Sequence, residues 1–232
     1  MRLPPAAERL ATEMKARYEI DVAGMVAGVR ARLESRLALS PLQIDADLEE
    51  RRAPFGIGHV RTTVFQAPRL RKLVLAEVRL WPVIEGFALT LLPELSVAAP
   101  VFAADFMLLP DRLSANADVY GAPERTRGVL TPLGDSFRQL GGGAGRPWTA
   151  PIRSGEGLFA RVSPRIVGEA FGATTSALGL YLDALAAAPA GDEERAQREF
   201  FQRFHEHGPR HGALRWIFGE AWAERFSRLA FE

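Results

Sequence analysis

Cysteine is absent from the 232 residues of the chain, and that absence excludes several kinds of site. Without thiolates the chain forms no disulfide, offers no cysteine nucleophile and supplies no sulfur ligand to an iron–sulfur cluster or a structural zinc ion. Long apolar runs are missing too: none approaches the roughly 20 residues that a transmembrane helix requires, and charges interrupt the N-terminal stretch where a secretory signal is continuous. We therefore expect a cytoplasmic protein without membrane contacts.

Charge of one sign is lacking as well, because 29 basic residues nearly balance 28 acidic ones and leave a net charge of +1. That balance gives no reason to expect a nucleic-acid partner. Basic residues are nevertheless crowded in the first third of the chain: Arg51, Arg52, Arg61, Arg69, Arg71, Lys72 and Arg79. They predict either a patch for an acidic partner or an ordinary solvated surface.

The motifs of several common enzyme classes are also missing. The sequence contains no Walker loop, dinucleotide-binding fingerprint, H-E-x-x-H zinc motif or G-x-S-x-G nucleophile elbow. The glycine-rich segment 140–147 neither follows a predicted strand nor opens a predicted helix, so we interpret it as a flexible loop. His205, His207 and His211 are close in sequence, but the Gly-Pro pair at 208–209 breaks the helix between them. We expect no metal site there, and interpret His211 as a proton donor or an orienting group.

Periodic apolar residues predict helices at both ends of the chain and strands between them. The helices are expected at 5–17, 22–37, 163–187, 191–206 and 219–229, and the strands at 58–66, 70–80, 83–92, 101–109 and 113–120. Because these strands follow one another without intervening helices, we expect an antiparallel meander. Strand 70–80 is apolar on both faces and must be covered on both sides. The prediction is one domain over residues 1–232, a three-layer α/β/α sandwich of the α+β class with a central antiparallel sheet.

Asp105 is the outstanding candidate for chemistry, since it interrupts an otherwise apolar strand. An ionised carboxylate in that setting must be paired, hydrogen-bonded or protonated. The protonated form would suit a proton donor near neutral pH, whereas a structural ion pair would explain the same residue without any catalytic role.

The strand 113–120 carries apolar side chains on one face and Ser114, Asn116, Asp118 and Tyr120 on the other. In a sheet covered on both sides, a polar face indicates a lined cavity, although an outer strand with one wet face has the same pattern. If that face adjoins Asp105, the two make a polar floor in an apolar pocket.

Several stretches together resemble the ferredoxin-dependent bilin reductases. Arg71-Lys72-Leu73 opens a strand as in that family, and Pro100 to Asp105 is similar to the family's P-x-F-G-x-D, with Ala103 at the glycine. Residues 208–212 and 218–226 are similar to its D-P-x-x-G and F-G-x-x-W-x-x-R-F endings, and Trp148 precedes a strand near Phe159 as a family tryptophan does. The matches run in order from about residue 55 to the C-terminus.

The resemblance implies a bilin held between an antiparallel sheet and the C-terminal helices. It implies reduction of a linear tetrapyrrole, typically biliverdin, by a radical mechanism in which reduced ferredoxin supplies single electrons and no cofactor is bound. Asp105 matches the family's central aspartate, and the expected catalytic residues are Asp105, His211 and His207. The expected substrate-binding residues are Asn116, Asp118, Trp148, Arg71 and Trp216. The cations around Arg71 would suit an acidic electron donor or the propionates of the substrate.

The chain also departs from the family pattern. Gly208 stands where a second aspartate is usual, and Ala76 and Ala88 stand where some members have a glutamate and a histidine. Glu77 is adjacent, but an offset of one residue points its side chain to the opposite face of the sheet. The alternative interpretations are therefore a non-catalytic tetrapyrrole-binding protein, which keeps the pocket without the second donor, and a plain interaction domain.

Overall fold

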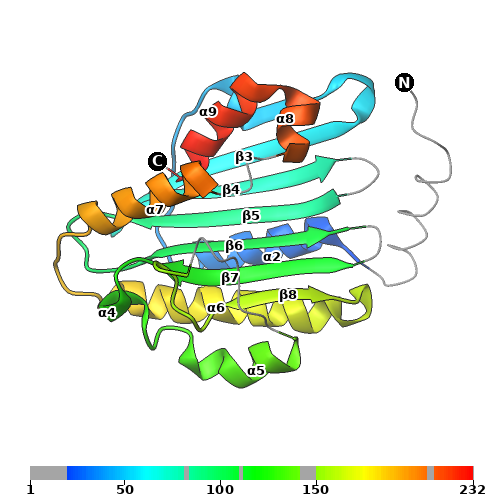
Figure 1. Cartoon of the computed structure of the whole chain (residues 1–232). Coiled ribbons are helices and arrows are strands. Elements are labelled where there is room, and N and C mark those ends of the chain that lie inside the picture. The colour runs from blue at the N-terminus through cyan, green and yellow to red at the C-terminus, as the bar shows by residue number, and fades with distance from the viewer. Residues whose placement is uncertain (1–19, 81–83, 110–111, 142–149, 208–211, 232) are drawn as a thin grey trace.

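The computed structural model describes residues 20–80, 84–109, 112–141, 150–207 and 212–231, and its centre is an antiparallel sheet (Figure 1). In this part of the chain the sheet has eight strands in the order β1-β3-β4-β5-β6-β7-β8, with β2 paired to β3. The strands are β1 Ser40–Pro41, β2 Glu50–Arg52, β3 Gly58–Ala67, β4 Leu70–Leu80, β5 Ile84–Pro93, β6 Val101–Leu108, β7 Leu113–Tyr120 and β8 Leu158–Val162. The predicted meander is confirmed.

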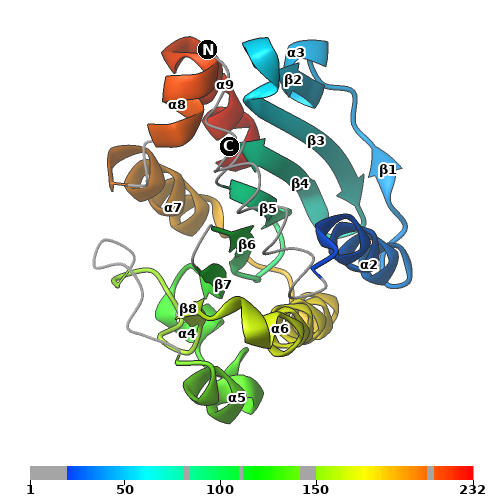
Figure 2. The same ribbon diagram turned by 90° about the vertical axis from the view of Figure 1, so that its right-hand side faces the viewer.

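Helices cover both faces of the sheet, as Figure 2 shows along the strands. One face carries α2 (Val22–Glu34) and α6 (Val167–Ala187), and the other carries α7 (Glu194–His207), α8 (Gly212–Phe218) and α9 (Glu220–Phe231). Shorter helices are α3 (Ala46–Glu49), α4 (Pro123–Thr126) and α5 (Gly134–Gln139), and 3-10 turns lie at Pro54–Gly56, Thr131–Leu133 and Pro164–Ile166. The three-layer α/β/α sandwich is confirmed. Within the described ranges, no helix has the length and apolarity that a membrane span needs.

Local signals in the sequence explain where the long helices begin. The Asp21 carboxylate accepts a hydrogen bond from the Gly24 amide at 2.9 Å and caps α2. Ser163 caps the turn that leads into α6 in the same way, followed by Pro164 in the first turn. The face of the sheet under these helices buries a continuous core of aromatic and aliphatic side chains.

The structure adds elements that sequence patterns did not predict and leaves two predictions untested. β1 and β2 are too short to show an alternating pattern, and β8 follows a loop rather than a tight turn. The predicted helix 5–17 and most of the glycine-rich segment 140–147 lie outside the described residues.

Candidate active site

The strand register aligns the residues of interest in one row across the sheet. Ala76 on β4 is paired with Ala88 on β5, Ala88 with Asp105 on β6, and Asp105 with Asn116 on β7. Paired residues of antiparallel strands project to the same face and lie about 5 Å apart. The row therefore presents two small side chains, one carboxylate and one amide to the α7–α9 face of the sheet.

Asp105 is held by its neighbour in this row. The Asn116 amide Nδ2 donates a hydrogen bond of 2.7 Å to Asp105 Oδ2, and the same nitrogen lies 3.4 Å from Ser114 Oγ. Asp105 is half-buried. The prediction that the polar face of 113–120 adjoins Asp105 is confirmed, and the amide fixes the orientation of the carboxyl group.

A pocket of about 410 Å³ lies over this row, between the sheet and the C-terminal helices. Its polar lining consists of Thr90, Asp105, Arg112, Ser114 and Arg161. Its apolar lining from the sheet consists of Val74, Ala76, Val78, Leu80, Ile84, Ala88, Met107 and Leu109, and from the helices of Leu214, Phe226, Ala230 and Phe231. A largely apolar cavity of this volume with a few polar groups is typical of a small-molecule site.

Ala76 and Ala88 have a direct effect on the space above the sheet. Both line the pocket, and both are flanked along their strands by larger side chains such as Val74 and Thr90. A methyl group at each of these two central positions leaves the volume that a longer side chain would occupy. The small side chains of Ala76 and Ala88 therefore leave open space in the pocket beside Asp105.

Two arginines that sequence reasoning did not single out line the same pocket. Arg112 precedes β7, Arg161 lies on β8, and both are exposed residues. The register pairs Arg161 with Ser114, which is also part of the lining. Guanidinium groups bind carboxylates through charge-assisted hydrogen bonds. Only the pairing of β7 with β8 reveals this site, because the two arginines are distant in sequence.

Arg71, predicted to bind substrate, lies at an irregularity at the start of β4 and contacts α7 instead of the pocket lining. Its Nε donates to Gln197 Oε1 at 3.1 Å, and its guanidinium lies 5.5 Å from the centre of the Phe201 ring. Burial lowers the pKa of Arg71. Arg69 in the adjacent turn donates to the carbonyls of Leu185 and Ala188 at the end of α6. Both arginines thus join helices to the sheet.

Asp118 is 0% exposed and lies outside the pocket lining. Its Oδ1 accepts hydrogen bonds from the Val119 amide at 2.8 Å and from the Ser154 hydroxyl, whereas Oδ2 has no partner within the described residues. Burial raises the pKa of Asp118 to about 6. Gly157 packs so closely that a Cβ there would lie 2.3 Å from Asp118 Cγ. Asp118 therefore anchors the segment before β8 to β7.

The remaining predicted residues lie elsewhere or outside the description. Trp216 on α8 is 75% exposed, whereas Leu214 two residues earlier lines the pocket. Trp148, His211 and the side chain of His207 lie outside the described residues. Glu77 borders a hollow on the α2 face together with His59 and Arg79, which confirms its predicted orientation away from Asp105. In the described part of the chain no group of acidic and histidine side chains is placed to hold a metal ion.

Fold and site together define an α/β/α protein with a ligand pocket between its antiparallel sheet and its C-terminal helices. The sequence model of the ferredoxin-dependent bilin reductases matches residues 26–230, and the chain belongs to that family. Among solved structures it is similar to phytochromobilin synthase from tomato in complex with biliverdin, with a TM-score of 0.76, 14% identity, and coverage of 90% of this chain and 84% of that chain. No curated protein sequence matches significantly. At this identity the structural likeness shows the fold.

Proposed function

We propose that the chain reduces a linear tetrapyrrole of the biliverdin class with electrons from reduced ferredoxin, and that Asp105 donates a proton to the substrate. The observation that carries the proposal is the Asp105 carboxyl group, held by Asn116 and facing a mostly apolar pocket under the C-terminal helices. Family membership over residues 26–230 supports the electron donor and the class of substrate.

The lining of the pocket suits both the apolar body and the charged propionates of such a substrate. A bilin has a flat conjugated body and two propionates, so it requires apolar walls and cationic partners at one edge. Phe226, Phe231 and the row of small residues supply the walls, and Arg112 and Arg161 supply the cations. We assign no direct substrate contact to Asn116, Arg71, Asp118 or Trp216, since none of the four lines the pocket.

The electrons and protons of the proposed reaction balance without any cofactor bound to the protein. Two reduced ferredoxins are each oxidised by one electron, and one double bond of the bilin gains two electrons and two protons. In the proposed mechanism the Asp105 carboxyl group, which faces the pocket, passes a proton to the bilin after an added electron has made the bilin more basic. On sequence grounds we propose His211 as the second donor, with His207 as the other candidate.

The test is Asp105→Asn, assayed anaerobically with biliverdin, ferredoxin and a ferredoxin-reducing system. The amide retains an oxygen that can accept the Asn116 hydrogen bond but cannot act as a general acid, so turnover is expected to fall about 100-fold or more. Biliverdin binding, measured by absorption titration, is expected to persist. Unchanged turnover in the variant would remove Asp105 from the mechanism.

A non-catalytic tetrapyrrole-binding protein is the second candidate. It is favoured by Ala76 and Ala88, which leave Asp105 as the one ionisable group in the row across β4 to β7. The same anaerobic assay separates the two functions. A shifted absorption spectrum without any new bilin after many equivalents of reduced ferredoxin would indicate binding alone, whereas a reduced bilin would indicate the enzyme.

A further inference from the structure

Helix α9 forms the outer wall of the pocket through Phe226, Ala230 and Phe231. Elsewhere its buried side chains pack against apolar residues of β3 and β4. Apolar contacts of this kind have no preferred direction. Directional contacts from α9 to its neighbours therefore add to this packing in setting the rotation and height of α9 over the sheet, on which the width of the pocket depends.

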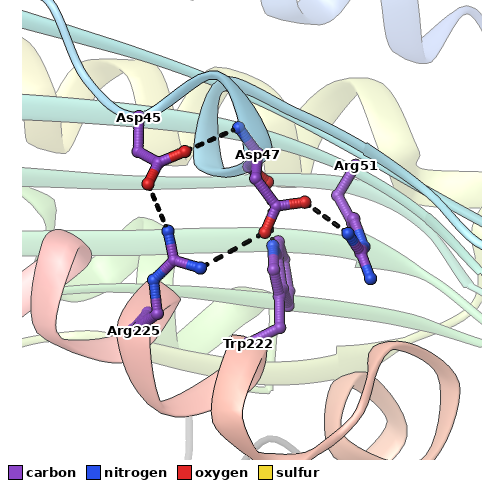
Figure 3. Close-up of polar contacts among 5 residues, drawn as sticks. All are labelled: Asp45, Asp47, Arg51, Trp222 and Arg225. Atoms are coloured by element: carbon purple, nitrogen blue, oxygen red, sulfur yellow. Dashed lines mark hydrogen bonds and ion pairs between the residues drawn. The ribbon is translucent and has the colours of Figure 1, made fainter.

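Directional contacts join α9 to the short helix α3 at the sheet edge (Figure 3). The Trp222 indole Nε1 donates to the backbone carbonyl of Asp47 at 2.8 Å. Arg225 donates from Nη2 to Asp45 Oδ2 at 2.5 Å and from Nη1 to Asp47 Oδ2 at 3.3 Å. Because Trp222 and Arg225 are three residues apart, both reach α3 from neighbouring turns of one helix face. We call these four residues the α3–α9 clamp.

The α3 side of the clamp is itself held in place. Asp45 caps α3 by accepting the Asp47 amide at 3.0 Å, and the Asp47 carboxylate also accepts from Arg51. Arg51 lies on β2 and is paired with Val60 of β3. The clamp thus fixes the position of α9 relative to the edge of the sheet.

The clamp and the pocket wall share one part of α9. The Trp222 ring stacks on Phe226 with centroids 5.2 Å apart and planes 11° apart, and Phe226 lines the pocket. Phe226 is also the residue after Arg225. Since packed side chains leave little free volume, a small shift of Trp222 must move Phe226 with it.

We infer that Arg225 is a positioning residue that sets the width of the pocket for a flat ligand by joining α9 to Asp45 and Asp47. This inference rests on the proposed function for the identity of the ligand. Exposed ion pairs contribute little to global stability, and the Arg225 side chain is 46% exposed. Its loss is therefore expected to change ligand affinity and the local opening of α9 more than the unfolding temperature.

The experiment compares Arg225→Gln with Arg228→Gln. Arg228 is the matched control, because it lies on the same helix, is exposed, and pairs with Glu224 at 2.7 Å within that helix. Hydrogen exchange of the α9 amides and the Kd for biliverdin are measured for both. Arg225→Gln is expected to raise both the exchange rate and Kd about fivefold, and to alter the induced circular dichroism of bound biliverdin. Arg228→Gln is expected to change none of the three.

A second variant tests whether the effects of Arg225→Gln come from the clamp or from a general loss of folding. Asp45→Asn keeps a capping side chain for α3 but removes one carboxylate from Arg225, so it is expected to change exchange and Kd about threefold in the same direction. Equal exchange of the α9 amides in Arg225→Gln, Arg228→Gln and the wild type would overturn the clamp. If the wild type binds no biliverdin, the proposed function fails, and the exchange comparison still decides whether the clamp positions α9.

Discussion

The two faces of the sheet differ in how the same strands are used. On β6, Phe102, Ala104 and Phe106 are buried in the continuous core under α2 and α6, whereas Asp105 and Met107 between and after them line the pocket under α8 and α9. On the first face the aromatic rings pack together: Phe106 stacks on Phe87 with ring centroids 5.8 Å apart. The alternation of β-structure thus lets one strand serve stability with one set of side chains and ligand binding with the other.

The largest expected effect comes from neighbouring residues on opposite faces of β6. Phe106, 1% exposed, fills the closed core, so Phe106→Ala is expected to lower the free energy of unfolding by about 3–5 kcal/mol. Met107→Ala is expected to cost only about 1 kcal/mol, because Met107 borders an existing cavity and is half-buried. Urea denaturation measures both. Equal losses would show that the α8–α9 face is packed as tightly as the other.

The next effect concerns the Asp118 carboxylate, which is fully buried on the same face of β7 as Asn116 but outside the pocket lining. Because burial raises the pKa of Asp118 to about 6, folding favours its protonated form. Its stabilising contribution is complete below pH 4 and is lost as the pH rises through 6, a change of about 3 kcal/mol. Urea unfolding of Asp118→Asn and the wild type at several pH values tests this. The stability of the variant relative to the wild type is expected to rise between pH 4 and 7, and parallel curves would rule out burial as the cause.

The smallest expected effect is that of one alanine-to-leucine substitution on each face of the sheet. Ala88→Leu adds a side chain inside the pocket, and is expected to raise the Kd for biliverdin about tenfold with little effect on stability. Ala115→Leu adds the same atoms to the closed core, where Ala115 is fully buried, and is expected to cost about 1–3 kcal/mol of unfolding free energy. Absorption titration and urea denaturation of both variants measure the contrast. Unaltered affinity in Ala88→Leu would place the ligand elsewhere.

Predictions from the sequence succeeded where local physics decides the outcome. Strands 70–80 and 113–120 have the predicted bounds, and α2 and α6 begin near their predicted caps at Asp21 and Ser163. Alternation and capping act within a few residues and leave their pattern in the sequence. The predicted contact of Asp105 with the polar face of 113–120 was conditional, because it depends on which strands pair.

Long-range pairing accounts for what was missed. Arg112 and Arg161 both line the pocket because β7 pairs with β8, and Arg225 donates to Asp45, which is 180 residues away in the sequence. The substrate-binding role of Arg71 stays a prediction; its side chain lies at α7, where it donates to Gln197. No short sequence pattern encodes such contacts, because strand pairing and helix docking bring together residues that are distant in the chain.

The sequence by itself determined the alternation of the strands, the caps of the long helices and the carboxylate placed among apolar residues. The tertiary structure decided that Asp105 lies beside Asn116, that Ala76 and Ala88 widen a pocket next to it, and that α9 is tied to α3 over that pocket. The physical reason is range: backbone and burial preferences act along the chain, whereas the register and the docking of helices select which distant side chains share a cavity.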